Sequence, residues 1–191
     1  MFQKLFLVAI ALVLTGCAPS GGLLVSNEAD NLGGNLFVEM TAEGDRFLVL
    51  DGEITTQTSA VFQQVVQQTD VEGLVIAQSP GGDLLASHQI GRTVKARNMN
   101  TLVLVNCISA CVDVFVAGKR REMTDIAELG MHSATNREIS YEIDRRYWLE
   151  MGFPEVNEKA YQVPNSQLWV IDAQRARELR MATAVLQSPS S

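Results

Sequence analysis

Apolar residues along this chain form short continuous runs that alternate with segments of helical periodicity. A short continuous apolar run is typical of a strand that is covered on both faces. Three such runs are residues 47–50, 73–77 and 101–105. Apolar side chains three and four positions apart predict helices after these strands. The expected helices span residues 61–68, 83–94 and 109–117. This alternation predicts an α/β fold with βαβ units, a largely parallel sheet and right-handed crossovers.

The rest of the chain predicts further elements of the same kinds. They are a strand end at 127–132, an amphipathic helix from about 139 that Gly152 closes, a helix that begins at Pro154, and a last helix that Asp172 caps and that ends near 180. Residues 183–191 are expected to form a flexible tail. No internal repeat is visible.

The N-terminus has the layout of a secretory signal peptide. Lys4 precedes ten apolar residues at 5–14, and small residues follow them. This run is too short to span a bilayer, which needs about twenty residues. The step Leu-Thr-Gly-Cys at 14–17 resembles the lipobox of bacterial lipoproteins. The resemblance implies cleavage before Cys17 and acylation of its thiol, by palmitate among other chains, so that the protein is anchored to a membrane.

The residue after Cys17 is Ala18 rather than aspartate. By resemblance to lipoprotein sorting signals, this implies the outer membrane of a bacterial cell envelope, with the folded domain facing the periplasm. We therefore expect a signal peptide at 1–16, a lipidated N-terminus and Gly-Ser-rich tether at 17–35, one domain at 36–182 and the tail at 183–191.

Composition narrows the classes of function. The 191 residues have room for one domain of ordinary size, and 15 Lys+Arg against 22 Asp+Glu give a net charge of −7. Nucleic-acid binders need a basic face, so we expect no nucleic-acid partner. No phosphate-binding P-loop and no G-x-G-x-x-G motif occur in the sequence, and two histidines are too few for most His-rich metal sites. We expect no cofactor and no metal.

Three segments follow predicted strands, where sites form in parallel sheets. They are residues 78–83 (Gln-Ser-Pro-Gly-Gly-Asp), 106–111 (Asn-Cys-Ile-Ser-Ala-Cys) and 130–133 (Gly-Met-His-Ser). Glycines in the first segment let backbone N–H groups face an incoming group. The second segment presents Ser109 at the entrance of a helix, and the third presents His132.

Taken in this order, the three segments resemble the Clp protease fold, shared in outline by signal peptide peptidase A and the crotonases, and more closely a group of periplasmic proteins of that superfamily. The resemblance runs from about residue 47 to about 180. It implies that Ser109 is the nucleophile, that His132 is its general base, and that the N–H groups of Gly82 and Ala110 form the oxyanion hole. A serine hydroxyl is a weak nucleophile until a neighbouring base takes its proton.

The chain departs from the Clp pattern at the third catalytic residue. Where that family has an aspartate before the last helix, residues 164–172 offer no acid at the expected place. Gln167 or Asn165 could orient the imidazole through a side-chain carbonyl. Asp172 is the nearest carboxylate, but it fits better as the cap of the last helix. A neutral orienter stabilises imidazolium poorly.

Other readings of these residues stay open. Ser109 could merely cap its helix, a role that serine fills well, and His132 could be a satisfied histidine at a strand end. A Ser–Lys dyad is the other option for catalysis, although no lysine occupies a matching position; the candidates are Lys95, Lys119 and Lys159. His88 lies inside a predicted helix and fits a packed or surface residue.

Cys107 and Cys111 flank Ser109 at a spacing of one helical turn. Outside the cytosol they could form a disulfide that holds the backbone under the hydroxyl, or they could be two buried thiols. A zinc site made of both cysteines and His132 lacks a fourth partner and a usual spacing.

Two functions of different classes follow. The first is a membrane-anchored serine hydrolase of the envelope, in the first place a peptidase with peptide or protein substrates. The alternative is a catalytically weak or inactive binding or assembly lipoprotein of the same fold. Clp-type relatives assemble into rings or trimers, so the resemblance also implies a homo-oligomer.

Overall fold

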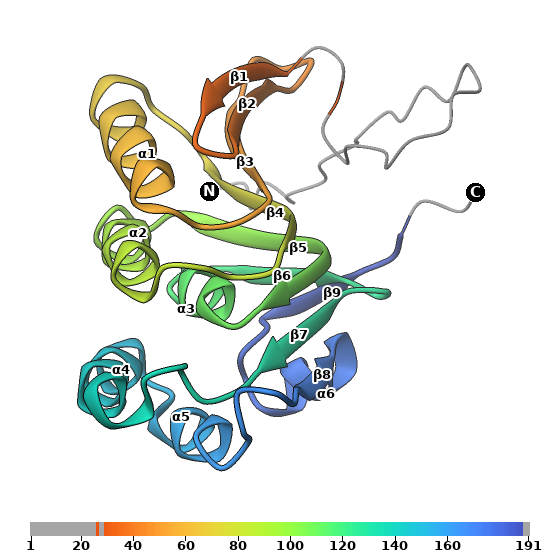
Figure 1. Ribbon diagram of the computed structural model, residues 1–191. Helices are drawn as coiled ribbons and strands as arrows, with labels where there is room; N and C mark the ends of the chain where they lie inside the picture. Colours follow the sequence, from red (N-terminus) through yellow and green to blue (C-terminus); the bar gives the residue numbers. More distant parts are fainter. Residues whose placement is uncertain (1–25, 27–28, 189–191) are drawn as a thin grey trace, which may run out of the picture.

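The computed structural model describes Ser26 and residues 29–188 (Figure 1). The expected signal peptide, Cys17, most of the expected tether and the last three residues of the expected tail lie outside the described residues. Within the described part, none of the helices is both long and apolar enough to cross a bilayer.

The described residues form one mixed sheet and a set of helices in α/β order. The strands are β1 (Asp30–Gly33), β2 (Leu36–Met40), β3 (Arg46–Asp51), β4 (Gly73–Ser79), β5 (Asn100–Ile108), β6 (Arg121–Thr124), β7 (Glu128–Met131), β8 (Trp169–Asp172) and β9 (Ala184–Leu186). The helices are α1 (Thr56–Gln68), α2 (Leu84–Ala96), α3 (Ala110–Val116), α4 (Arg137–Met151), α5 (Pro154–Ala160) and α6 (Ala173–Glu178).

The centre of the sheet is parallel, as the strand–helix alternation predicts. Strands lie side by side in the order β1-β2-β3-β4-β5-β6-β9. The pairs from β3 to β9 along this order are parallel, and β1, β2 and β3 form an antiparallel edge. Strand β7 pairs in parallel with the last residues of β5 and carries β8 antiparallel on its other side. The carboxyl ends of β4, β5 and β7 therefore meet at one edge, where sites form in such sheets.

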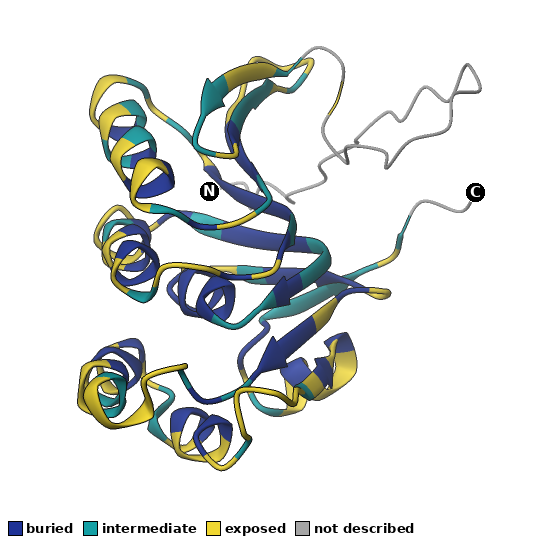
Figure 2. Cartoon of the chain, in the orientation of Figure 1, coloured by how far each residue is buried: buried dark blue, intermediate teal, exposed yellow. Residues whose placement is uncertain are grey.

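The main core lies between the sheet and one layer of helices. In Figure 1, α1, α2 and α3 lie along one face of the sheet, and α4 and α5 lie beyond α3. Successive side chains of β3 alternate between the faces, so that Leu48 and Leu50 join the main core while Phe47 and Val49 join a smaller cluster on the opposite face. Both clusters are buried, and helix surfaces turned away from the sheet are exposed (Figure 2).

Local signals placed several element boundaries correctly. Asp83 caps α2 by accepting from the N–H of Ala86 at 2.8 Å, and Asp172 caps α6 by accepting from the N–H of Arg175 at 2.7 Å. The expected tether at 17–35 and the expected tail at 183–191 are both too long, because each contains a strand. Strand β1 pairs with β2, and β9 pairs with β6, so backbone hydrogen bonds to neighbours order both ends. Strand β1 (Asp-Asn-Leu-Gly) is too polar to be predicted from its own pattern, and β9 (Ala-Val-Leu) is apolar but only three residues long.

Candidate active site

Ser109 occupies a sharp turn between β5 and α3. Its φ of 55° and ψ of −128° lie in a region that residues other than glycine rarely adopt, and that therefore costs conformational energy. The N–H of Ser109 donates to the carbonyl of Gly130 in β7 at 2.7 Å. A sharp strand-to-helix turn of this kind exposes a serine hydroxyl above the end of a sheet. In the described structure the Ser109 side chain makes no capping hydrogen bond, so the reading of Ser109 as a helix cap is wrong.

The glycine turn after β4 packs directly against the Ser109 turn. A Cβ added to Gly81 would lie 2.6 Å from the carbonyl oxygen of Ile108 and 2.9 Å from Cβ of Ser109. The carbonyl of Gly81 accepts from the N–H of Ile54 at 2.7 Å, and this pairing holds the turn in place. Only a residue without a side chain fits between these two backbone segments.

Two backbone donors remain available at this junction. Gly82 follows Gly81 with a φ of 136°, and Ala110 follows Ser109 as the first residue of α3. Among the hydrogen bonds of the described residues, none uses the N–H of Gly82 or of Ala110. These are the two donors that the sequence analysis assigned to the oxyanion hole.

His132 follows the last residue of β7 and lines the same cavity as Ser109. The cavity has a volume of about 40 Å³, enough for a water molecule or a small group. The parallel pairing of Ile108 with Gly130 brings the two segments together despite their separation in sequence. No hydrogen bond joins Ser109 to His132 among the described contacts. Hydrogen bonds between catalytic groups are often long before substrate binds.

A backbone carbonyl and an amide side chain hold the His132 ring. Its Nδ1 lies 2.8 Å from the carbonyl oxygen of Ser133 and 3.0 Å from Nδ2 of Asn165, and Asn165 Nδ2 also donates to the Ser133 carbonyl at 3.0 Å. When Nδ1 carries the proton it donates to the Ser133 carbonyl, and Nε2 is free to accept a proton from a hydroxyl. In that tautomer Asn165 Nδ2, which is also a donor, bonds the Ser133 carbonyl and not Nδ1. The Ser133 carbonyl was not foreseen, because every residue has one and no sequence signal distinguishes it.

Of the three predicted orienters, the structure brings only Asn165 to the imidazole, and it presents its amide nitrogen Nδ2 to Nδ1 rather than the side-chain carbonyl that was expected. Asp172 caps α6 instead, and Gln167 is exposed, with its backbone N–H donating to Pro164 at 2.9 Å. The lysines of the alternative Ser–Lys dyad do not line the cavity. Lys95 donates to the carbonyl of Glu150, and the Lys159 ammonium lies 5.0 Å from the centre of the Trp169 ring.

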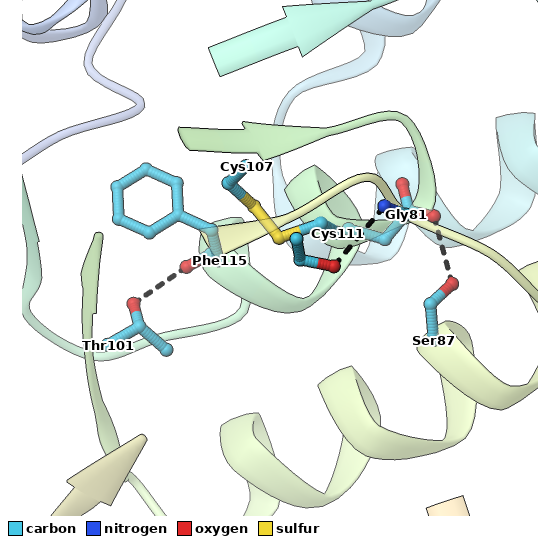
Figure 3. Close-up of a disulfide and its surroundings, with 8 residues drawn as sticks. Gly81, Ser87, Thr101, Cys107, Cys111 and Phe115 are labelled. Carbon is cyan, nitrogen blue, oxygen red and sulfur yellow. Dashed lines mark hydrogen bonds between the residues drawn. A yellow bond between two sulfur atoms is a disulfide. The ribbon is translucent and has the colours of Figure 1, made fainter. Parts of the chain in front are cut away.

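Cys107 and Cys111 form a disulfide that spans the Ser109 turn (Figure 3). Both are fully buried, one in β5 and the other in the first turn of α3, with Cα atoms 5.3 Å apart. The bond encloses Ser109 in a small covalent loop and ties the strand to the helix on either side of it. Because both sulfur atoms are in the disulfide, they do not form the zinc site with His132 that the spacing left open.

A buried polar cluster, made of His88, Asp113 and Asp144, adjoins the cavity. His88 Nε2 lies 3.1 Å from Oδ1 of Asp144 and 3.5 Å from Oδ2 of Asp113, and both aspartates line the cavity. Burial lowers the pKa of His88, but the two carboxylates close to its ring outweigh burial and raise it to about 9. Burial raises the pKa of Asp113, and contacts with His88 and Ser87 oppose that effect.

Sequence reasoning assigned His88 to packing or the surface and missed the aspartates. His88 is 1% exposed, so the surface reading was wrong, and it is ion-paired rather than simply packed. The one available signal was Asp113, which interrupts the apolar run of a short helix whose residues are all buried. A buried carboxylate needs a partner, but the pattern did not show which residue would supply it.

The chain shares its fold with solved structures of a membrane-bound protease. A serine-to-alanine mutant of the 1510-N membrane-bound stomatin-specific protease matches with a TM-score of 0.56 and 13% identity, over 74% of this chain and 78% of that one. A lysine-to-alanine mutant of the same protease, in complex with a substrate peptide, matches with a TM-score of 0.56 and 14% identity, over 74% of each chain. No family model and no curated protein matches the sequence. The structural matches confirm the expected Clp-like α/β fold.

The contact between the two turns predicts that Gly81→Ala disrupts the site. Its new Cβ would collide with the backbone at Ile108, so the free energy of unfolding should fall by roughly 3–5 kcal/mol. Gly44→Ala is the matched control, since Gly44 has a φ of 89° and a Cβ there would meet nothing within 4 Å. That control should lose only about 1 kcal/mol. Urea unfolding of both variants measures the difference, and equal losses would contradict the close packing described here.

Proposed function

We propose that this chain is a serine hydrolase of the Clp-like fold that cleaves peptide bonds, with Ser109 as nucleophile and His132 as general base. The observation that carries the proposal is the strained Ser109 turn, which opens with His132 onto one cavity beside two free backbone donors. Strained backbone at a polar residue is typical of functional sites.

The geometry supports acyl transfer in two steps. Ser109 Oγ attacks a carbonyl carbon while His132 Nε2 takes the hydroxyl proton, and the N–H groups of Gly82 and Ala110 donate hydrogen bonds to the carbonyl oxygen as negative charge develops on it. His132 then gives its proton to the leaving amine, and the peptide C–N bond breaks. Water, activated by the same imidazole, hydrolyses the acyl-enzyme and restores Ser109.

The neutral environment of His132 sets an upper limit on the rate. The Ser133 carbonyl holds the tautomer that a general base needs, but it carries no charge to stabilise the imidazolium that forms. In a Ser-His-Asp triad the aspartate both holds the correct tautomer and stabilises the imidazolium, and the groups around His132 supply only the first of these. We therefore expect slow turnover with a nucleophile that still reacts with activated substrates.

Peptides are the proposed substrates. The similar solved structures are of a protease, and one of them holds a substrate peptide. This chain has the same fold, and its candidate nucleophile lies at the end of a parallel strand, where ligands of such sheets bind.

The proposed location is the bacterial envelope, with a lipid anchor at Cys17 and the domain in the periplasm. The disulfide at Cys107 and Cys111 supports a compartment outside the cytosol, because disulfides persist in oxidising surroundings. Because Ala18 rather than aspartate follows Cys17, we propose the outer membrane as the location of the anchor.

A catalytically inactive binding lipoprotein is the second candidate. Two observations favour it: no carboxylate contacts His132 among the described residues, and no hydrogen bond joins His132 to Ser109. A protein of this kind would use the same cavity edge to hold a peptide without cleaving it.

Labelling with a fluorophosphonate probe distinguishes the two candidates. The wild-type protein should be labelled at Ser109, and Ser109→Ala and His132→Ala should each abolish labelling. Because the Ser109 side chain makes no capping bond, Ser109→Ala should change the free energy of unfolding by less than about 0.5 kcal/mol. Ser140→Ala, on α4, is the control that keeps full labelling. Equal labelling of wild type and Ser109→Ala would rule out the hydrolase.

Asn165→Asp tests the missing charge. A carboxylate at this position would face Nδ1 of His132, stabilise the imidazolium and raise the rate of probe labelling or peptide hydrolysis by about tenfold or more. Asn165→Ala removes the amide without adding charge and should give no increase. An unchanged or lower rate in Asn165→Asp, in a protein that folds like wild type, would count against His132 as the base.

Cys17→Ser tests the anchor. The substitution removes the thiol that the lipobox-like step assigns to acylation, so the protein should move from the membrane fraction to the soluble fraction and should not incorporate labelled palmitate. A Ser26→Ala variant, changed in the same N-terminal region, should stay in the membrane fraction. Membrane-bound and fully processed Cys17→Ser protein would exclude the lipoprotein assignment.

A further inference from the structure

The buried cluster of His88, Asp113 and Asp144 contains two carboxyl groups and only one imidazole. Three helices contribute to it: α2 supplies His88, α3 supplies Asp113 and α4 supplies Asp144. All three residues are at least nine-tenths buried. The candidate ligand atoms of the three side chains all lie within 4.8 Å of one another.

Two of these atoms lack a hydrogen bond of acceptable geometry. They are Nε2 of His88 and Oδ1 of Asp144, which lie 3.1 Å apart yet are both buried without a hydrogen-bond partner. The N–H of an imidazole is directed along one line, and here that line does not lead to either carboxylate. An imidazole nitrogen and a carboxylate oxygen that converge without bonding are arranged as two ligands of one cation would be.

The spacing of the atoms fits a small divalent ion. A tetrahedral zinc ion with bonds of about 2.0–2.1 Å holds neighbouring ligand atoms about 3.3 Å apart. The distances from His88 Nε2 to the two aspartate oxygens are 3.1 Å and 3.5 Å, on either side of that value. Only the two carboxylates would need to approach each other for all three ligands to contact the ion.

The charges of the cluster also favour a divalent cation. Burial raises the pKa of Asp113, so both aspartates ionise together only when two positive charges lie beside them, and a proton on His88 supplies one. No lysine or arginine forms an ion pair with Asp113 or Asp144 among the described residues. A divalent cation with a neutral imidazole balances both charges, which removes the cost of an unpaired buried charge.

Neighbouring hydroxyl groups orient the two carboxylates. Tyr161 donates to Oδ2 of Asp144 and leaves Oδ1 directed toward His88. The Ser87 hydroxyl lies 3.1 Å from Oδ2 of Asp113 and 2.7 Å from the carbonyl oxygen of Leu84, so two acceptors compete for its one proton. Metal-ligating carboxylates in proteins are held by outer hydrogen bonds of this kind.

We propose that His88, Asp113 and Asp144 bind a divalent transition-metal ion, Zn²⁺ in the first place. One imidazole and two carboxylates are a ligand set that suits this ion. Asp113 and Asp144 also line the cavity of about 40 Å³, so the fourth position of the ion faces a space that holds a water molecule. The three ligands are different residues from the proposed nucleophile and base, although both sets adjoin the same cavity, and the metal site does not depend on the proposed hydrolase activity.

Zinc binding to the full-length protein tests this proposal. The protein is treated with a chelator, dialysed and titrated with ZnCl₂, and bound metal is counted by mass spectrometry and affinity by competition with a chromophoric chelator. We expect one ion per chain, and we expect His88→Gln and Asp144→Asn each to weaken binding by about a hundredfold or more. Tyr161→Phe, which removes an outer hydrogen bond, should weaken it by about 10–100-fold.

The second histidine supplies the matched control. The chain has two histidines, so His132→Gln removes the other imidazole and should leave zinc stoichiometry and affinity unchanged. Cys17 is present in every protein compared, so any contribution from its thiol cancels. Substitution of Co²⁺ should give the visible absorption of a tetrahedral site in the wild type and in His132→Gln, and not in His88→Gln.

Three results would overturn the proposal. They are no zinc uptake by the folded wild-type protein, equal affinity in His88→Gln and wild type, or loss of binding in His132→Gln. The first would mean that a proton on His88 holds the cluster as a buried ion triad. If His88→Gln does not fold, Asp144→Asn and Tyr161→Phe decide the question, since both closely preserve the size of the side chain.

Discussion

The backbone of one residue, Ser109, is the constraint on which the rest of the site depends. Its left-handed conformation is costly and persists only because neighbours hold it from three sides. Gly81 packs against it without a side chain, Gly130 accepts its N–H, and the disulfide closes the loop around it. The same turn sets the direction of the hydroxyl, frees the N–H of Ala110 and starts the helix that carries Asp113.

The parallel register of β4, β5 and β7 explains why one edge of the sheet holds every candidate group. Parallel neighbours end at the same side, so the glycine turn, the serine turn and the histidine segment meet there. The candidate site needs no long insertion, because it is made of strand ends and the first residues after them. The antiparallel strands β1 and β2 lie beyond β3 and β4, away from the Ser109 turn, whereas antiparallel β8 pairs with β7 beside it.

The candidate base His132 and the buried carboxylates belong to two networks that adjoin one cavity. His132 is held by neutral groups, the Ser133 carbonyl and the Asn165 amide, whereas both nearby carboxylates contact His88. In a Ser-His-Asp triad the carboxylate stabilises the imidazolium directly. Here the buried acids belong to a separate cluster that joins α2, α3 and α4, so the imidazole at the strand end lacks that support while the helices gain a polar anchor.

Short stretches of sequence were enough to predict the strands buried on both faces and the helix caps at Asp83 and Asp172. They were also enough to place Ser109 and His132 directly after β5 and β7. Each of these depends on a few consecutive residues, so short-range physics decides it. Tertiary structure alone decided which of the candidate orienters reaches the imidazole, and it alone brought His88 together with two aspartates. Contacts of that kind join side chains from separate elements, and their partners follow from how helices pack rather than from any pattern along the chain.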